Sequence, residues 1–287
     1  MESQERTQHE GEGLWEQIFS RGNLLAALER VRKNGGVPGI DGMTVEELPD
    51  HLRNHWEGIR AKLDRGSYVP SPVKRVEIPK PKGGVRRLGI PTVLDRMIQQ
   101  AIHQVLTPIF EPTFSPHSYG FRPGRSAHDA VKAAQDHIEA GYSWVVDIDL
   151  EKFFDTVNHD RLMAQLKDKI IDKRVLRLVN AYLKAEVMED GMVTTATEEG
   201  TPQGSPLSPL LSNIVLTELD TKLEERGLRF VRYADDCNIY IKSQRSAQRV
   251  LKSTTAFIEG RMRLKVNEAK SAVGRANERT FLGFSFY

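Results

Sequence analysis

Hydrophobic side chains recur at helical spacing in three parts of the chain's first 110 residues, namely residues 24–31, 45–63 and 92–110. Apolar residues three or four positions apart share one face of a helix, so each stripe predicts a helix. Thr92 followed by Asp95 is typical of a capping box. The third helix is therefore expected to begin there.

Other parts of the chain alternate between apolar and polar residues, which is typical of strands. Residues 73–79 and 85–90 alternate on either side of a glycine pair and predict a hairpin. Residues 230–241 predict another hairpin, because two runs of aromatic and β-branched residues flank Asp235 and Asp236. We expect these two aspartates at its tip.

From residue 145 onward, the pattern predicts strand, helix, insertion, helix, strand, strand, helix and strand. The insertion covers about residues 171–200 and carries a helical pattern and a short hairpin, while the last strand is expected at residues 264–266. This order is typical of a split β-α-β antiparallel sheet with helices on one face, within an α+β fold. In such a sheet, the strand bearing Asp149 can lie beside the hairpin tip.

Composition limits the classes of protein to be considered. With 287 residues, 39% of them hydrophobic, the chain can bury one large core or two lobes. The single cysteine, Cys237, excludes a disulfide framework and a cysteine-rich zinc site, and favours a reducing, cytoplasmic location. No apolar run is long enough to cross a bilayer, so no membrane partner is expected.

The net charge of +2 conceals an uneven distribution. Basic side chains gather in residues 60–87, where Lys74 and Arg75 are candidates for binding a nucleic-acid backbone. Lys80 and Arg86 flank the glycine turn of the first hairpin and could hold a triphosphate together, as a point charge and a bidentate fork. A solvated, charged hairpin is the alternative interpretation.

A loop at residues 118–125 interleaves arginines with aromatic residues. Arg122 and Arg125 follow Tyr119 and Phe121, a combination that suits a phosphate backbone and stacked bases. The alternative is an ordinary loop that tucks both rings inward. The sequence leaves both interpretations open.

Carboxylates provide the candidate chemistry. Asp147 and Asp149 lie two positions apart on one predicted strand and point to the same face. Burying them is costly unless they are paired or bind a metal. If this strand lies beside the hairpin, Asp149, Asp235 and Asp236 converge. Such a group can hold two divalent ions, one activating an attacking hydroxyl and one holding a triphosphate.

Several blocks resemble a known family. Residues 233–236, Tyr-Ala-Asp-Asp, resemble the signature of reverse transcriptases. The blocks at residues 119–124, 145–155 and 201–209 resemble those of bacterial group II intron reverse transcriptases and maturases, and they occur in the expected order. The resemblance extends from about residue 23 to residue 286.

The resemblance implies right-hand polymerase fingers and palm. An N-terminal extension and fingers are expected at residues 1–143 and a palm, including the insertion, at residues 144–287. The implied activity is RNA-directed DNA synthesis by nucleotidyl transfer from dNTPs onto a DNA primer, using two Mg²⁺ ions for which Mn²⁺ can substitute. The implied partners are an RNA template and, for a maturase, intron RNA.

The resemblance also assigns the acids. By motif position, Asp149, Asp235 and Asp236 are expected to be the catalytic metal ligands. Asp147 competes for the first position. Asp149 is preferred because Phe154 then has the family's spacing for the aromatic residue that excludes a ribose 2′-hydroxyl.

Further roles follow from motif position. Lys80 and Arg86 fall where the family holds the incoming triphosphate, and Gln203 falls where the nascent pair is contacted. The family continues past the palm into a thumb, whereas this sequence stops at Tyr287. A truncated apolar face would favour a homodimer. The alternative function is that of an RNA-binding splicing cofactor without productive polymerase activity.

Overall fold

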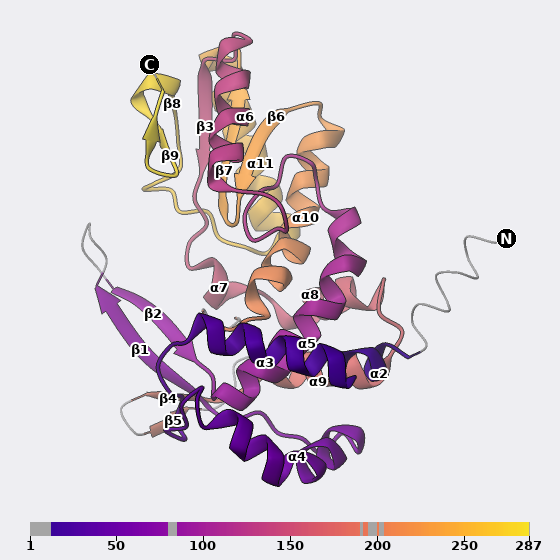
Figure 1. Ribbon diagram of the computed structural model, residues 1–287. Helices are drawn as coiled ribbons and strands as arrows, with labels where there is room; N and C mark the ends of the chain where they lie inside the picture. Colours follow the sequence, from indigo (N-terminus) through magenta and orange to yellow (C-terminus); the bar gives the residue numbers. More distant parts are fainter. Residues whose placement is uncertain (1–12, 80–84, 190–191, 195–199, 201–203, 287) are drawn as a thin grey trace, which may run out of the picture. The chain divides into compact units, whose positions relative to one another are not determined.

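The computed structural model describes residues 13–79, 85–189, 192–194, 200 and 204–286. The chain forms two compact units (Figure 1). Unit 1 comprises Met1–Phe110 with Asn158–Ser208, and unit 2 comprises Glu111–Val157 with Pro209–Tyr287. The units group residues that contact one another, and the functional boundary expected after residue 143 stays a prediction.

Unit 1 combines helices with a small sheet. Its helices are α2 (Leu14–Ile18), α3 (Arg21–Asn34), α4 (Leu48–Asp64), α5 (Val93–Phe110), α8 (His159–Lys167) and α9 (Lys173–Leu183). Its strands are β1 (Val73–Pro79), β2 (Val85–Ile90), β4 (Val187–Glu189) and β5 (Met192–Thr194). The three helices expected from the apolar stripes are therefore present as α3, α4 and α5.

The sheet of unit 1 has the strand order β2-β1-β4-β5. The predicted hairpins are both present, since β1 is antiparallel to β2 and β4 is antiparallel to β5. The two hairpins join through a parallel pairing that places Val73 opposite Val187 and Lys74 opposite Met188. The insertion expected within the palm thus pairs with the first hairpin, because its strand satisfies the main-chain groups along one edge of β1.

Asp95 connects three segments inside unit 1. Its carboxylate is 1% exposed and accepts hydrogen bonds from the hydroxyls of Tyr68 (2.7 Å), Thr92 (2.7 Å) and Tyr182 (3.1 Å). The Ser71 N–H also donates to it, at 3.1 Å. The Asp95 N–H in turn donates to the Thr92 hydroxyl at 3.2 Å, so Thr92 caps the start of α5 as predicted, and Asp95 also ties this end of the helix to α9.

Unit 2 is built around a second sheet. Its helices are α6 (Ala127–Glu139), α7 (Phe153–Thr156), α10 (Ser208–Glu225) and α11 (Gln244–Phe257), with short helical turns η1 (Glu111–Thr113), η2 (Ile258–Met262) and η3 (Ala276–Glu278). Its strands are β3 (Trp144–Ile148), β6 (Arg229–Tyr233), β7 (Asp236–Ile241), β8 (Ala272–Arg275), β9 (Thr280–Phe281) and β10 (Phe284–Ser285).

The main sheet of unit 2 has the order β6-β7-β3-β8, and every pairing is antiparallel. The predicted antiparallel palm sheet is therefore confirmed. The prediction of a strand at residues 264–266 is wrong, because Val266 makes only an isolated bridge to Leu150. The chain turns at residues 267–271, where the Ser271 N–H donates to the Asn267 carbonyl, and the edge strand β8 begins after that turn.

Helices pack against both faces of this sheet (Figure 1). Ala130 and Ala134 of α6 share a buried cluster with Val145 of β3 and Tyr240 of β7. Arg232 of β6 meets α10 through hydrogen bonds to Asp220, and α11 contacts β3, β7 and β8. In addition to the helical layer expected on one face, α6 thus covers part of the other.

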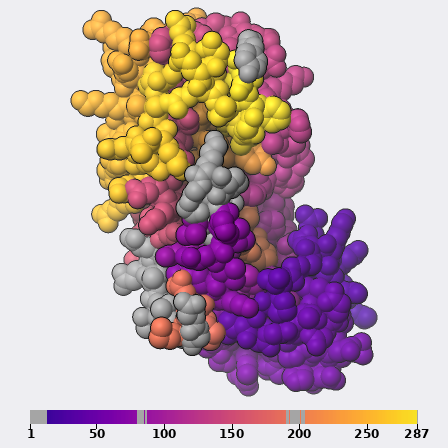
Figure 2. Space-filling view, turned by 90° about the vertical axis from the view of Figure 1, so that its left-hand side faces the viewer, coloured from indigo at the N-terminus to yellow at the C-terminus, as the bar shows by residue number. Residues whose placement is uncertain are grey.

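The C-terminal residues of unit 2 lie at its surface, where Figure 2 shows them in yellow. Phe281 is buried in the cluster beneath α6, whereas Phe284 is 42% exposed. Among the residues that the structure describes, no helix is long and apolar enough to cross a membrane.

Candidate active site

The turn between β6 and β7 consists of Ala234 and Asp235 and is closed by the pairing of Tyr233 with Asp236. Ala234 has a φ of 57°, the left-handed conformation that two-residue hairpin turns require and that glycine or asparagine usually provides. The two aspartates are therefore at the hairpin tip, as the sequence predicted.

The strand β3 brings the other acids to the same end of the sheet. Its ladder with β7 pairs Asp147 with Asn238 and Ile148 with Cys237. Asp149 is the next residue, so the same register carries it beside Asp236. Acids that are more than 80 residues apart in the sequence thus become neighbours.

A turn after residue 266 supports Asp149. The Asp149 N–H donates to the Ser271 hydroxyl at 2.9 Å, and the Asn267 N–H donates to the Asp149 carbonyl at 2.8 Å. The ammonium of Lys270 lies 3.4 Å from Asp149 Oδ2. A cation therefore already faces this carboxylate.

The acids interact electrostatically. The pKa of Asp236 is raised to about 7, first by burial and then by the neighbouring carboxylates of Asp147, Asp235 and Asp149, while Lys270 opposes the rise. The pKa of Asp147 is also raised, first by burial and then by Asp149, and Arg279, 3.8 Å away, opposes the rise. The negative charge of the clustered aspartates is therefore only partly offset by the nearby Lys270 and Arg279.

The donor chemistry fits a divalent cation. Hard cations such as Mg²⁺ prefer carboxylate oxygens, and their charge would relieve the repulsion that raises the pKa of Asp236. Within the described ranges, no three His, Cys, Asp or Glu side chains form a preassembled metal-binding group. The acids would therefore have to reorient to share an ion.

Phe154 lies on α7, directly after the β3 acids. Its ring is partly exposed and meets Phe153 edge-on, with 5.3 Å between the centroids. Phe153 is only 2% exposed and anchors the pair in the core. The expected contact of Phe154 with a ribose stays a prediction.

The structure describes only some of the other candidates for binding a nucleotide or nucleic acid. Lys80 and Gln203 lie outside the described residues. The backbone of Arg86 pairs with Ile78 in the β1–β2 hairpin. Lys74 is exposed on β1, while Arg75 lies 3.3 Å from Glu189 of β4 in an ion pair. Their binding roles stay predictions.

The guanidinium of Arg122, a predicted nucleic-acid contact, is buried and occupied in the structure, and its binding role stays a prediction. Its side chain is 4% exposed, and its Nε and Nη2 donate to Glu111 Oε1 at 2.9 and 2.7 Å. Its Nη1 donates to the carbonyls of Ser115 and Ser118. Arg122 therefore stabilises the conformation of the loop through these hydrogen bonds.

Arg125 is also engaged, but it is less buried. Its Nη1 donates to the carbonyls of Pro116 (2.6 Å) and Ser118 (3.1 Å), and its guanidinium lies over the Tyr119 ring. Tyr119 packs against the α6 cluster, whereas Phe121 is 50% exposed. One ring of the loop, Tyr119, is thus packed inward and the other, Phe121, is open to solvent. Nucleic-acid binding by Arg125 stays a prediction.

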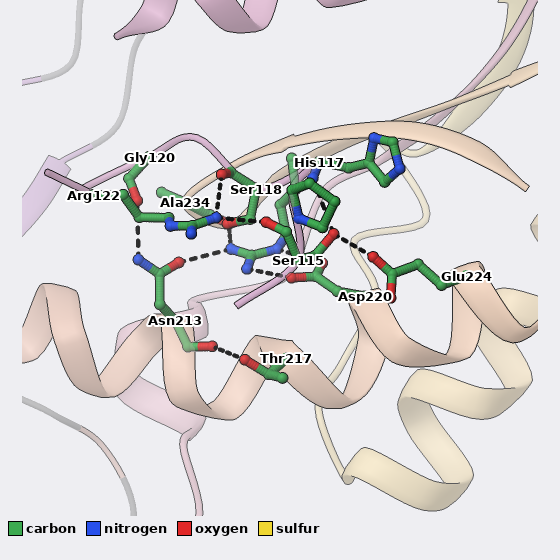
Figure 3. A network of polar contacts seen from close by, with 12 residues as sticks. Ser115, His117, Ser118, Gly120, Arg122, Asn213, Thr217, Asp220, Glu224 and Ala234 are labelled. Atoms are coloured by element: carbon green, nitrogen blue, oxygen red, sulfur yellow. Dashed lines mark hydrogen bonds and ion pairs between the residues drawn. The ribbon is translucent and has the colours of Figure 1, made fainter. Parts of the chain in front are cut away.

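Sequence reasoning missed a buried polar group beside the hairpin tip, formed by Arg232, Asp220 and Asn213 (Figure 3). Arg232 interrupts an otherwise apolar and aromatic run. A charged residue in the middle of a predicted buried strand was the available signal, since such a charge needs a partner.

The comparisons with known proteins agree with this fold and site. Residues 78–286 match the family model described as "Reverse transcriptase (RNA-dependent DNA polymerase)", and the chain belongs to this family. It is 33% identical to "Protein YkfC" of Escherichia coli (strain K12), over 94% of this chain and 80% of that protein. It is 37% identical to "Group II intron-encoded protein LtrA" of Lactococcus lactis subsp. cremoris, over 67% of this chain and 31% of that protein.

Solved structures support the expected polymerase fold. A chain of a "Cas6-RT-Cas1--Cas2 complex" superposes with a TM-score of 0.52 at 26% identity, and the match covers 84% of this chain and 26% of that chain. Telomerase from Candida albicans, at 13% identity and a TM-score of 0.52 over 77% of this chain and 45% of that chain, shows the likeness of fold alone. The chain spans less than a third of the length of LtrA, so the activities of the whole intron-encoded proteins are only proposals for this chain.

Proposed function

We propose that this protein is an RNA-directed DNA polymerase that transfers nucleotides from dNTPs onto the 3′-hydroxyl of a DNA primer. The observation that carries the proposal is the β3–β7 register, which brings Asp149 beside the tip that holds Asp235 and Asp236. Membership of the reverse transcriptase family supports it.

The proposed metal ligands are Asp149, Asp235 and Asp236, holding two Mg²⁺ ions for which Mn²⁺ can substitute. When bound, the ions supply positive charge to the primer hydroxyl and to the triphosphate. The residues of the chain contribute orientation: the ladder and the turn around Ser271 fix Asp149, and Lys270 balances part of its charge until metal binds.

Further residues are proposed to select and hold the nucleotide. Phe154 is partly exposed next to the acids and would exclude a ribose 2′-hydroxyl. Lys80 and Arg86 would hold the triphosphate, and Gln203 would contact the nascent pair. Their support is the position that each occupies in the family's motifs.

Intron RNA is a proposed partner. Its support is the 37% identity to LtrA and the 34% identity to "Putative COX1/OXI3 intron 1 protein" of Saccharomyces cerevisiae. Lys74, Arg75 and Arg125 are the proposed contacts with a nucleic-acid backbone. Homodimerisation and a cytoplasmic location also remain proposals, the first to be checked by the mass of the purified protein in solution.

The test of polymerase activity is primer extension on an RNA template with Mg²⁺. Asp235→Asn keeps the size of the side chain but removes a charged oxygen, so we expect the rate to fall by about 100-fold or more. Asp136→Asn, in an exposed position on α6, is the matched control and should extend the primer like the wild type.

Equal extension by the wild type and Asp235→Asn would overturn the proposal. In that case RNA binding without polymerisation, the role of a splicing cofactor, would be the remaining function. It would be measured as retained affinity of both proteins for structured RNA.

A further inference from the structure

Arg232 is a fully buried arginine close to the proposed catalytic turn. It lies on β6, three positions before Asp235, and its side chain is 0% exposed. Its Nε and Nη2 donate to the two carboxylate oxygens of Asp220 on α10, at 2.7 and 2.6 Å. This is a bidentate, fully desolvated ion pair.

The remaining nitrogen of Arg232 reaches the turn itself. Nη1 donates to the carbonyl of Ala234 at 2.8 Å and to Asn213 Oδ1 at 3.0 Å, two residues that Figure 3 labels. Ala234 carries the positive φ of the turn, a conformation that costs free energy for a residue with a Cβ. The hydrogen bond from Arg232 therefore holds a strained peptide in place.

A loop clamps the same turn from another side. The Tyr119 N–H donates to the Arg232 carbonyl at 2.8 Å, and the Arg232 N–H donates to the His117 carbonyl at 2.9 Å. Asn213 Nδ2 donates to the Gly120 carbonyl at 2.9 Å, so one asparagine side chain bridges Arg232 and the loop.

Stability alone is a weak explanation for this arrangement. A buried ion pair often gains little over apolar residues of similar size, because the desolvation penalty offsets the attraction. The Arg232–Asp220 pair also makes a hydrogen bond, through Arg232 Nη1, to the carbonyl of Ala234, the residue that precedes the two proposed metal ligands. Groups that orient metal ligands commonly change metal affinity when they are altered.

We infer that Arg232, held by Asp220 and bridged by Asn213, is a positioning residue that fixes the Ala234 peptide so that Asp235 and Asp236 face their metal ions. This inference rests on the proposed function. Arg232 does not touch the reacting atoms; it acts through the carbonyl of Ala234 and the backbone of the turn.

The test compares Mn²⁺ binding and Mg²⁺-dependent primer extension in two variants. Arg232→Lys keeps a cation opposite Asp220 but loses the fork that also reaches Ala234, and Asn213→Ala removes the bridge to Gly120. Both should raise the Mn²⁺ dissociation constant, measured from free Mn²⁺ in electron paramagnetic resonance with primer–template present, by about tenfold or more. The Mg²⁺ concentration for half-maximal extension should rise similarly, and excess Mg²⁺ should restore part of the rate.

Val250→Ala is the control for destabilisation. Val250 is buried on α11, so its truncation lowers stability without removing a contact to the turn. At a temperature where thermal unfolding shows every variant folded, Val250→Ala should keep the wild-type Mn²⁺ affinity.

Two failures can be separated. If Asp235→Asn loses Mn²⁺ binding but Arg232→Lys and Asn213→Ala bind it like the wild type, the positioning role is overturned and the polymerase proposal stands. If Asp235→Asn binds Mn²⁺ and extends primers like the wild type, the acids are not the metal ligands, and both proposals are overturned.

Discussion

At the scale of single residues, the hairpin turn depends on contacts that fit with little room to spare. Gly120 lies against the Tyr233–Ala234 peptide, and a Cβ added there would be 2.9 Å from the Tyr233 carbonyl carbon and 3.1 Å from Ala234 Cα, and closer still to the Ala234 nitrogen. Backbone atoms cannot move aside as a flexible side chain can. Gly120 is thus required for the space it leaves.

Gly120→Ala should therefore displace the turn or the loop. Overpacking of this kind costs about 1–3 kcal/mol, and the free energy of unfolding from urea titration should fall by that amount. We also expect slower primer extension from the folded protein, because the displaced turn carries Asp235.

Gly260→Ala is the matched control, since nothing lies within 4 Å of a Cβ at that position. It should change neither stability nor extension by a comparable amount. Wild-type stability in Gly120→Ala would show that the loop does not pack as tightly on the turn as the structure indicates.

At the scale of elements, polar groups inside the core connect segments that the sequence presents separately. Asp95 opens α5, yet it also accepts hydrogen bonds from Tyr68 before β1 and from Tyr182 on α9. The cap formed by Thr92 and Asp95 was predictable from the sequence, whereas the contacts with the two tyrosines were not. Their contacts depend on how the elements pack.

Stability should depend on pH through Asp95. Burial raises its pKa above the ordinary value, although the hydrogen bonds from Tyr68, Thr92, Ser71 and Tyr182 oppose the rise. A raised pKa in the folded state means that folding favours the protonated form. Its contribution is therefore fully present below the unfolded pKa, about 4, and is lost as the pH rises through the folded pKa.

The measurement is urea unfolding of the wild type and Asp95→Asn at several pH values. The stability of the wild type relative to Asp95→Asn should decrease as the pH rises above about 4. Asp160→Asn, at an exposed position on α8, should not reproduce this trend, because its charge stays in water. A difference between wild type and Asp95→Asn that is independent of pH would contradict the expectation.

At the scale of the whole molecule, charge is nearly balanced, with a net charge of +2, so binding to nucleic acid has to come from local groups of basic side chains. Lys74 is exposed on β1, next to Arg75. The side chain of Arg122, by contrast, is only 4% exposed. Fewer basic side chains are therefore available at the surface than the count of arginines and lysines suggests.

Salt dependence measures those contacts. The logarithm of the RNA association constant should fall linearly with the logarithm of salt concentration, and Lys74→Gln should make the slope shallower by about 0.7–0.9, the value for one phosphate contact. Fluorescence anisotropy of a labelled RNA between about 50 and 200 mM salt provides the measurement.

Lys252→Gln, an exposed lysine of α11, is the matched control and should leave the slope unchanged. Equal slopes for Lys74→Gln and the wild type would exclude Lys74 from the contact surface.

The sequence by itself determined α3, α4 and α5, both hairpins of the sheet in unit 1 and the hairpin that carries Asp235 and Asp236, because local periodicity and turn residues specify each of them. It also determined family membership, through motifs in order. Only the tertiary structure decided that Arg122 is buried, that the edge strand is β8 and that β4 pairs with β1. It alone brought Arg232, Asp220 and Asn213 together beneath the turn. Burial, strand pairing and desolvated ion pairs depend on residues far apart along the chain, and no local pattern records which of them will meet.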